Sequence, residues 1–456
     1  MVKVILKRGR DESLRRFHPW VFSGAVAQVQ GSPAEGDIVA VYSAEGQPLA
    51  AGHWQIGSIA VRILSFDADP TAPDFWLESL HRALQVRIAA GLYSVCEVSE
   101  PVGELPLKTS GCAGPLPSDD GPLPLTVPRV ARFSEALADM ANPETPQTTC
   151  FRLVHGEGDA LPGLIIDWYD GVCVMQAHSA GMFRARMQIC EALKTLFGER
   201  LKAVYDKSSG TAPFKAGLDL VDGYLWRAAD FTASETVVLE NGRKFLVNWE
   251  EGQKTGFFLD QRDNRALVGK YAAGRSVLNL FCYTGGFSIY ALTSGAVRVD
   301  SVDSSAKAIS LVERNIALNS GDGRGGSWQL PGVEFNNYCE DAIEFLRKIP
   351  EGKYDLIIVD PPAFAKHRGA LQNALRAYQR LNAAAISRVA PGGLVFTFSC
   401  SQVVDKITFA NTVFSAAAQT GRSVRILDRL CQGCDHPVSI YHPEGEYLKG
   451  LLLYVE

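Results

Sequence analysis

A short apolar run that is broken by two glycines constrains the fold of this chain more than any other stretch. Residues 276–281 are apolar enough for a strand buried on both faces, and an apolar pattern of helical period resumes after Gly285 and Gly286 and runs to Leu292. Glycines at such a turn let the backbone approach a ligand at the N-terminus of the helix. The stretch therefore predicts a strand, a tight turn and a helix that seat a cofactor.

Two carboxylates follow at the positions where such a unit places its cofactor contacts. The run from Gly295 to Asp303 is typical of a second strand, and Asp303 comes about 20 residues after the turn, where a ribose-hydroxyl acceptor is expected. Asp341 stands at a strand-to-helix junction and could accept from an adenine amino group. An N-cap is the plainer interpretation of Asp341, and both roles can hold together.

Two further strand ends carry groups suited to chemistry on a planar substrate. An apolar strand ends in Asp360-Pro-Pro362, and the prolines stop the strand and leave Asp360 beside the cofactor turn. Phe364 follows, at a place where its ring could stack on a base. The last strand, which begins with Pro391-Gly-Gly, ends at Cys400. Four strand ends are thus predicted to converge.

The order of these motifs resembles the class I S-adenosylmethionine-dependent methyltransferases. Three flanking signatures narrow the resemblance to the RlmI-type 23S ribosomal RNA cytosine-5 methyltransferases: Gly256-Phe-Phe-Leu-Asp-Gln-Arg262, Phe398-Ser-Cys-Ser401, and Asp435-His-Pro-Val438 with Tyr447-Leu-Lys-Gly450. The resemblance covers nearly the whole chain. It implies S-adenosylmethionine as the cofactor and 23S ribosomal RNA as the partner. A homodimer is a possible oligomeric state, which the sequence does not decide.

The motifs and the resemblance together give a set of expected site residues. The expected catalytic residues are Cys400 and Asp360. The residues expected to bind S-adenosylmethionine are Gln261, Phe281, Tyr283, Thr284, Gly285, Gly286, Asp303, Ser304, Asp341, Ala342 and Asp360. The residues expected to bind RNA are Lys7, Arg8, Arg10, Pro361, Pro362 and Phe364. Arg262 and Arg265 are expected near a phosphate or the cofactor carboxylate.

The whole chain is predicted to be an α/β protein with a β-rich N-terminal module. Short apolar runs and turns as far as Phe66 suggest a small β-barrel, and Pro19–Gly24 with Glu35–Val41 resembles the PUA domain, an RNA-binding module. We expect this barrel over 1–70, a helix with a proline- and glycine-rich insertion over 71–150, a central α+β domain over 151–235, and a Rossmann-like methyltransferase domain over 236–456.

Composition narrows the class of protein. The 456 residues are 46% hydrophobic and can bury large cores, while no window is long and apolar enough to span a membrane, so a cytoplasmic protein is expected. The net charge of −5 indicates that any RNA contact is local, as on the basic arm within the first sixteen residues. The ten cysteines include one CxxC, at Cys431 and Cys434, and no metal site is predicted.

The predicted chemistry needs a thiolate, because carbon 5 of cytosine becomes nucleophilic only after attack at carbon 6. Cys400 is the candidate, since Cys282 lies in the cofactor turn. Asp360 would hydrogen-bond to cytosine N3, and it must be protonated to donate, which an apolar site favours by raising its pKa. The base that removes the carbon 5 proton is not identified from the sequence.

Three alternatives stay open at this point. Asp-Pro-Pro motifs also occur in enzymes that methylate ring or amino nitrogens, which need no nucleophile. A non-catalytic RNA-binding or assembly factor could keep the same fold, although the intact Asp303, Asp341, Asp360 and Cys400 argue against it. A nicotinamide dehydrogenase is disfavoured because no G-x-G-x-x-G follows the first strand.

Overall fold

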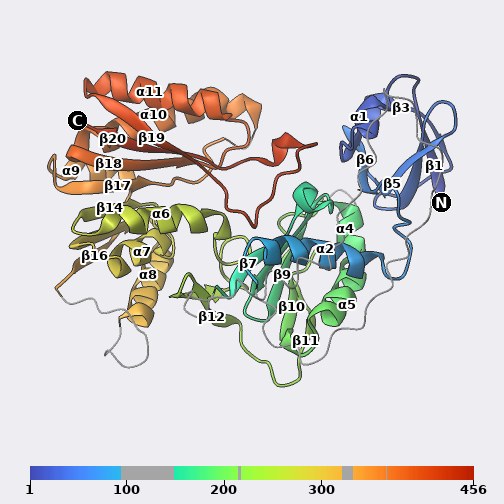
Figure 1. Cartoon of the computed structure of the whole chain (residues 1–456), viewed down its shortest axis with the longest axis horizontal. Coiled ribbons are helices and arrows are strands. Elements are labelled where there is room, and N and C mark those ends of the chain that lie inside the picture. Colours follow the sequence, from blue (N-terminus) through green and yellow to red (C-terminus); the bar gives the residue numbers. More distant parts are fainter. Residues whose placement is uncertain (94–147, 214–216, 321–331, 366) are drawn as a thin grey trace.

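The computed structural model describes residues 1–93, 148–213, 217–320, 332–365 and 367–456. The insertion expected within 101–128 and Lys366 lie outside these residues. Three sheets and a hairpin follow one another along the chain (Figure 1). Among the described residues, we find no helix whose length and apolar character would let it cross a membrane.

The N-terminal module is a six-stranded sheet with the strand order β2-β6-β5-β4-β1-β3. Short apolar runs alternate with turns here, and the buried side chains of Val4, Val39 and Val61 fill its core. The strands lie within the short apolar runs that predict a small β-rich module here, and β2 lies in the Pro19–Gly24 motif. The elements are β1 (Val2–Leu6), α1 (Glu12–Arg15), β2 (Trp20–Phe22), β3 (Val26–Gln30), β4 (Ile38–Tyr42), β5 (Pro48–Trp54) and β6 (Ile59–Ser65).

A central five-stranded sheet has the order β11-β10-β9-β8-β7, and the hairpin of β12 and β13 follows it. Asn241 and Gly242 form the turn of the hairpin, as predicted, and both have positive φ. The elements are α2 (Phe75–Ala89), β7 (Cys150–His155), β8 (Leu164–Tyr169), β9 (Val172–Ala177), α4 (Ala180–Arg184), α5 (Arg186–Phe197), β10 (Ala203–Asp206), β11 (Gly223–Arg227), β12 (Glu235–Glu240) and β13 (Arg243–Asn248).

The C-terminal part holds a seven-stranded sheet of order β16-β15-β14-β17-β18-β20-β19. The first five of these strands are parallel, whereas β20 runs antiparallel to both of its neighbours. The strands are β14 (Ser276–Leu280), β15 (Arg298–Asp303), β16 (Glu334–Cys339), β17 (Tyr354–Val359), β18 (Val389–Ser399), β19 (Val424–Cys431) and β20 (Lys449–Val455). This is the Rossmann-like sheet that the sequence predicted.

Helices cover both faces of the seven-stranded sheet (Figure 1). One apolar core joins the sheet to α6 (Arg262–Ala272), α7 (Gly286–Thr293) and α8 (Ala306–Asn319). A second core joins the other face to α9 (Ala342–Lys348), α10 (Leu371–Arg388) and α11 (Lys406–Thr420). Since both faces are buried, β17 is apolar along nearly its whole length, and β14 is apolar except for Ser276 and for the buried Asn279, whose amide donates to Ser288.

The loop of residues 432–448, which we call the β19–β20 loop, extends from the seven-stranded sheet toward the other two sheets (Figure 1). Its Tyr441 ring lies 5.3 Å from the ring of Phe17, and its His442 ring lies 4.3 Å from that of Trp20. Closer to the sheet, Asp435 accepts a hydrogen bond from the backbone N–H of Arg152 in β7. The loop therefore contacts both the N-terminal and the central part.

Candidate functional site

The expected catalytic and cofactor residues follow the carboxyl ends of neighbouring parallel strands. Asp303 ends β15, Asp360 follows β17, and Cys400 follows β18. After β14 the chain continues to β15 on one side of the sheet, and after β17 it continues to β18 on the other side. The strand order therefore reverses between β14 and β17, which makes a topological switch point there. In open α/β sheets, ligands bind outside the carboxyl ends at such a point. We call Asp303, Asp360 and Cys400 the strand-end site.

The turn after β14 is strained and closely packed. Phe281 and Tyr283 have positive φ angles of 58° and 47°, which residues other than glycine rarely adopt. A Cβ on Gly285 would lie 3.0 Å from Val312 of α8, and a Cβ on Gly286 would lie 2.9 Å from the Arg265 side chain. Gly285 also has a positive φ of 80°, so backbone conformation and close packing within the protein favour glycine here, a reason that the sequence does not reveal. Their contact with a cofactor stays a prediction.

Asp303 is oriented by two backbone groups. Its Oδ2 accepts from the N–H of Tyr283 at 3.0 Å, and its Oδ1 accepts from the N–H of Ser305 at 2.9 Å. Each carboxylate oxygen keeps a second lone pair, so the group can still accept hydrogen bonds from two hydroxyls. A hydrogen-bond acceptor at the end of β15 suits the hydroxyls of a ribose. The exposed Ser304 is the next residue. Thr284 is buried and its carbonyl accepts from Asn315.

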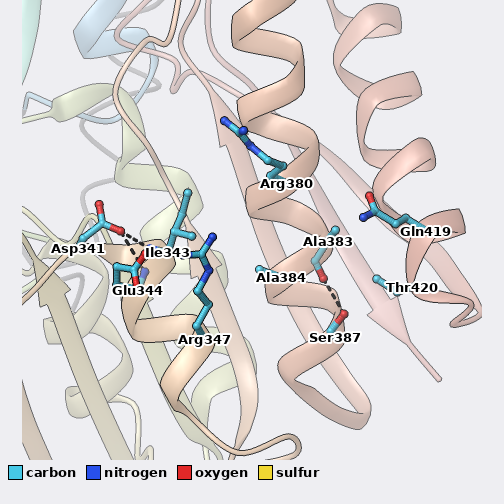
Figure 2. Close-up of a pocket in the computed structure, with 10 residues that line it drawn as sticks. All are labelled: Asp341, Ile343, Glu344, Arg347, Arg380, Ala383, Ala384, Ser387, Gln419 and Thr420. Atoms are coloured by element: carbon cyan, nitrogen blue, oxygen red, sulfur yellow. Dashed lines mark hydrogen bonds and ion pairs between the residues drawn. The ribbon is translucent and has the colours of Figure 1, made fainter.

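Asp341 is the N-cap of α9, the plainer of its two predicted roles. Its Oδ1 accepts from the N–H groups of Ile343 and Glu344 at 2.9 and 3.0 Å. Ala342, the first residue of the helix, is buried. Asp341 also lines a groove between helices, which Figure 2 shows from α9 across to α10 and α11. The groove lies on a helical face of the sheet, and its lining contains neither Asp360 nor Cys400.

Asp360 has a pKa that is raised toward neutral pH, as a general acid requires. Burial and the nearby negative charge of Asp260 raise its pKa to about 7, against the opposing effect of a hydrogen bond from Gln261. The Gln261 amide donates to Oδ2 of Asp360 at 3.0 Å, and its own oxygen accepts from Asn264. Gln261, expected in the cofactor wall, therefore also positions Asp360.

Cys400 is half-buried, between two fully buried serines. Burial and the charge of Asp360 raise the pKa of its thiol to about 11, while Lys254 acts in the opposite direction. Asp360 follows β17 and Cys400 follows its paired neighbour β18, so the two residues that the sequence predicts as catalytic lie at adjacent strand ends.

Two residues that the sequence analysis left without a role hold the segment around Cys400. The buried ammonium of Lys449 donates to the carbonyls of Ser401 and Val404 at 2.7 and 2.6 Å. The hydroxyl of Tyr378, in α10, lies 3.0 Å from the Oγ atoms of both Ser399 and Ser401. The motif 447–450 contains Lys449, which could have signalled its importance, whereas Tyr378 lies within an ordinary amphipathic helix.

The segment after Asp360 offers an aromatic ring. Pro361 is buried and Pro362 is exposed. Phe364 is half-buried, and its ring centroid lies 4.7 Å from that of Tyr378 at an angle of 48°. Phe364 is therefore fixed on one side and remains partly accessible for the stacking that the sequence predicts.

The sequence analysis also missed a lysine whose charge acts on the strand-end site. Lys254 is exposed, has a positive φ of 49°, and has its ammonium 4.8 Å from the Phe258 ring centroid. Its positive charge lowers the pKa of Cys400 and that of Asp360, among smaller contributions to each. Sequence alone gave no reason to separate this lysine from the rest of its loop.

The expected RNA-binding arm lies in the six-stranded module, at the other end of the molecule from the seven-stranded sheet (Figure 1). Lys7, Arg8 and Arg10 are exposed there. Lys7 donates to the carbonyl of Gly24 at 2.9 Å, and Arg8 lies 3.9 Å from Glu45. The arm and the strand-end site could therefore contact one ligand only if that ligand is long.

The prediction for Arg262 and Arg265 is wrong. Arg265 is buried and donates to both carboxylate oxygens of Glu240, and Arg262 is buried 2.5 Å from Asp435. Both guanidinium groups are buried against protein carboxylates, so neither is exposed to a phosphate or a cofactor carboxylate. Arg262 belongs to a set of buried charges between β7, α2, α6 and the β19–β20 loop that we call the ionic junction: Arg87, Arg152, Asp159, Asp167, Arg262 and Asp435.

A group of metal-ligating side chains lies where the β19–β20 loop meets the N-terminal module. One ligand atom each of His18, His442 and Glu444 lies within 4.8 Å of the others. His18 Nδ1 already accepts from the Trp20 N–H, and His442 Nδ1 faces the Glu444 carboxylate at 3.0 Å. Since these atoms already have protein neighbours, we assign no metal to the group.

The fold and the acidic strand ends together define an S-adenosylmethionine-dependent methyltransferase. The sequence model of that family matches residues 151–452, and the model of a PUA-like domain matches residues 4–66. A solved protein assigned as a methyltransferase and complexed with SAH superposes with a TM-score of 0.73 at 19% identity over 100% of both chains, which supports the fold. The predicted fold class and cofactor are confirmed.

Full-length relatives place the chain more narrowly. It is 36% identical to a protein of Aeromonas hydrophila over 99% of this chain and 98% of the relative, and 35% identical to one of Shewanella amazonensis over 100% and 99%. Both relatives carry the name Ribosomal RNA large subunit methyltransferase I. This chain belongs to their family, as the sequence motifs predicted.

Proposed function

We propose that this protein transfers a methyl group to carbon 5 of a cytosine in 23S ribosomal RNA, with Cys400 as the nucleophile. The names of the full-length relatives support a ribosomal RNA substrate. The observation that carries the choice of carbon 5 is the position of Cys400: its half-buried thiol follows β18, beside the end of β17 that carries Asp360. Methylation of a nitrogen would need no thiol at this position.

The residues around the switch point fit S-adenosylmethionine. Asp303 keeps acceptor capacity for ribose hydroxyls, and Asp341 follows the next strand in the order of the sheet. The other residues that we assign to the cofactor are Gln261, Phe281, Tyr283, Thr284, Gly285, Gly286, Ser304, Ala342 and Asp360. When bound, the cofactor supplies an electrophilic methyl group.

Cys400 and Asp360 would share one proton during the attack. At neutral pH the thiol holds its proton, and Asp360, whose pKa is about 7, is partly ionised. Transfer of the thiol proton to Asp360 gives a thiolate that attacks carbon 6, and a carboxylic acid that donates to cytosine N3. The same proton can therefore activate the nucleophile and neutralise the charge that builds on the ring.

The rest of the chain would hold the RNA. Phe364 can stack on the target base, with Pro361 and Pro362 shaping the slot, once the base has left its stack at a cost of a few kcal/mol. Lys7, Arg8 and Arg10 can contact phosphates at a distance from the target. A substrate with a stem and an exposed loop would reach both places.

Replacement of Cys400 by Ala separates this proposal from nitrogen methylation. With purified protein and 23S ribosomal RNA, we expect Cys400→Ala to abolish 5-methylcytosine while the binding of S-adenosylmethionine by calorimetry is kept. Cys431→Ala is the matched control and should retain methylation, since Cys431 is exposed at the end of β19. Retained methylation in Cys400→Ala would refute the proposal.

Mapping in cells would identify the nucleotide. Bisulfite or mass-spectrometric mapping of ribosomal RNA, with and without the gene, should show one cytosine that loses its methyl group. A ribosomal RNA substrate would also fit a cytoplasmic location, which the composition of the chain predicts. The homodimer stays a prediction that sedimentation velocity would test.

A further inference from the structure

Asp260 has one carboxylate oxygen with a partner and one without. Its Oδ2 accepts from the hydroxyl of Tyr447 at 2.6 Å. Its Oδ1 is buried and has no hydrogen-bond partner among the residues that the structure describes. An unpartnered buried carboxylate oxygen is costly, and such groups in native proteins usually have a functional explanation.

The position of Asp260 connects it to the strand-end site. It directly precedes Gln261, whose amide donates to Asp360 at 3.0 Å. Its negative charge also raises the pKa of both Asp360 and Cys400. Asp260 is therefore the chain neighbour of the residue that holds the proposed acid.

The pKa values of Asp260 and Asp360 are shifted in opposite directions. Burial alone would raise the pKa of Asp260, but neighbouring positive charges and the Tyr447 hydrogen bond leave it below its usual value. The charged or titratable groups that act on or face Asp260 are His436, Lys254, Arg152, Arg265, Tyr447, Asp360 and Cys400. Two neighbouring carboxyl groups whose pKa values are pushed apart typically divide the roles of acid and base.

We propose that Asp260 is the general base that removes the proton from carbon 5 of the methylated cytosine. This inference rests on the proposed function and supplies the base that the sequence analysis could not identify. The electron pair of the C5–H bond forms the C5–C6 double bond, and the C6–S bond to Cys400 breaks. Cys400 leaves as a thiolate and the proton ends on Oδ1 of Asp260, so the step needs no further reactant.

Asp260→Asn tests the assignment, because Asn keeps the shape of the side chain and cannot take the proton. We expect turnover to fall by about 10²- to 10⁴-fold, the usual contribution of a general base. At the same time, a methylated RNA adduct on Cys400 should accumulate, visible as a band that resists denaturing electrophoresis. Affinity for S-adenosylmethionine, measured by calorimetry, should stay within about twofold. Asp263→Asn, an exposed neighbour, is the control and should neither slow turnover nor trap an adduct.

Two results would overturn the assignment. Turnover of Asp260→Asn at the wild-type rate would exclude Asp260 as the base. Loss of adduct formation together with loss of S-adenosylmethionine binding would mean that Asp260 serves binding or structure instead. If the wild-type protein makes no 5-methylcytosine at all, the proposed function fails, and that result is distinct from both.

Tyr447→Phe provides a second test that does not alter the carboxylate. Without the Tyr447 hydroxyl, the pKa of Asp260 should rise, so the carboxylate should become protonated at a higher pH. A preformed adduct is transferred to a series of buffers of decreasing pH, and the rate of its decay is measured in each. The pH below which decay slows should be higher in Tyr447→Phe than in the wild type. An identical pH dependence of adduct decay in the two proteins would count against the proposal.

Discussion

The strand-end site and the ionic junction use the same residue types for opposite purposes. Asp435 in the junction is buried against Arg262, His436 and the backbone of Arg152, and its pKa lies well below the usual range because these groups outweigh burial. Asp360 is held by a single amide beside another carboxylate, and burial raises its pKa to about 7. An aspartate paired with a guanidinium fixes structure, whereas one that is held by an amide can exchange a proton.

Asp360→Asn should produce the largest loss of activity. The amide cannot pass a proton from Cys400 to cytosine N3, so we expect kcat to fall by about 10²- to 10⁴-fold. Methylation of 23S ribosomal RNA with a labelled methyl donor measures this loss. Because the substitution removes a carboxyl group that burial disfavours when ionised, the thermal midpoint should not decrease. A wild-type rate would show that Asp360 belongs with the structural aspartates.

Asp435→Ala should instead reduce stability. It leaves the buried guanidinium of Arg262 without its carboxylate, and breaking such a pair costs about 3–5 kcal/mol. The free energy of unfolding in urea measures the loss. The exposed Asp263 also approaches Arg262, at 3.7 Å, and Asp263→Ala should change stability by no more than about 0.5 kcal/mol. Equal effects of the two substitutions would contradict the distinction between the two regions.

The pH dependence of kcat/KM should report the shared proton. Below about pH 7 both Asp360 and Cys400 are protonated and the pair holds one proton too many, so activity should fall as the pH decreases. Above about pH 7 the pair holds one proton, and activity should become level. In Asp360→Asn the rise should continue to higher pH, toward the pKa of the thiol. A wild-type profile that declines from pH 7 to 9 would contradict this mechanism.

Lys449→Met should have the smallest effect of the four. The lysine donates to the carbonyls of Ser401 and Val404, on either side of the turn after Cys400. Loss of these hydrogen bonds should slow methylation by up to about tenfold, since one such bond contributes about 0.5–1.5 kcal/mol. The alkylation rate of Cys400 by iodoacetamide should fall in parallel. Lys406→Met, at an exposed ion pair with Glu446, is the control.

Local sequence patterns predicted much of the fold. The strands β17 and β18 are largely apolar runs that end at the motifs of Asp360 and Cys400, and the Asn241-Gly242 hairpin follows from backbone preferences alone. The prediction for Arg262 and Arg265 was wrong because their partners, Asp435 and Glu240, are distant in sequence.

The roles of Tyr378, Lys449 and Asp260 also depend on contacts between distant segments. Tyr447, for example, lies 187 positions from Asp260, to which it donates. Neither periodicity nor spacing contains that information. The sequence therefore identified the groups at the strand ends, which follow directly from the order of the strands, and missed the groups that hold and tune them.

The most direct test of the account is to trap the covalent step. In RNA with 5-fluorocytidine at the target position, the base cannot lose its carbon 5 substituent as a proton, so the methylated adduct should persist. We predict a stable protein–RNA complex that forms only with S-adenosylmethionine, and a tryptic peptide with the nucleotide attached to Cys400. The absence of a complex, or attachment to a different cysteine, would contradict the account.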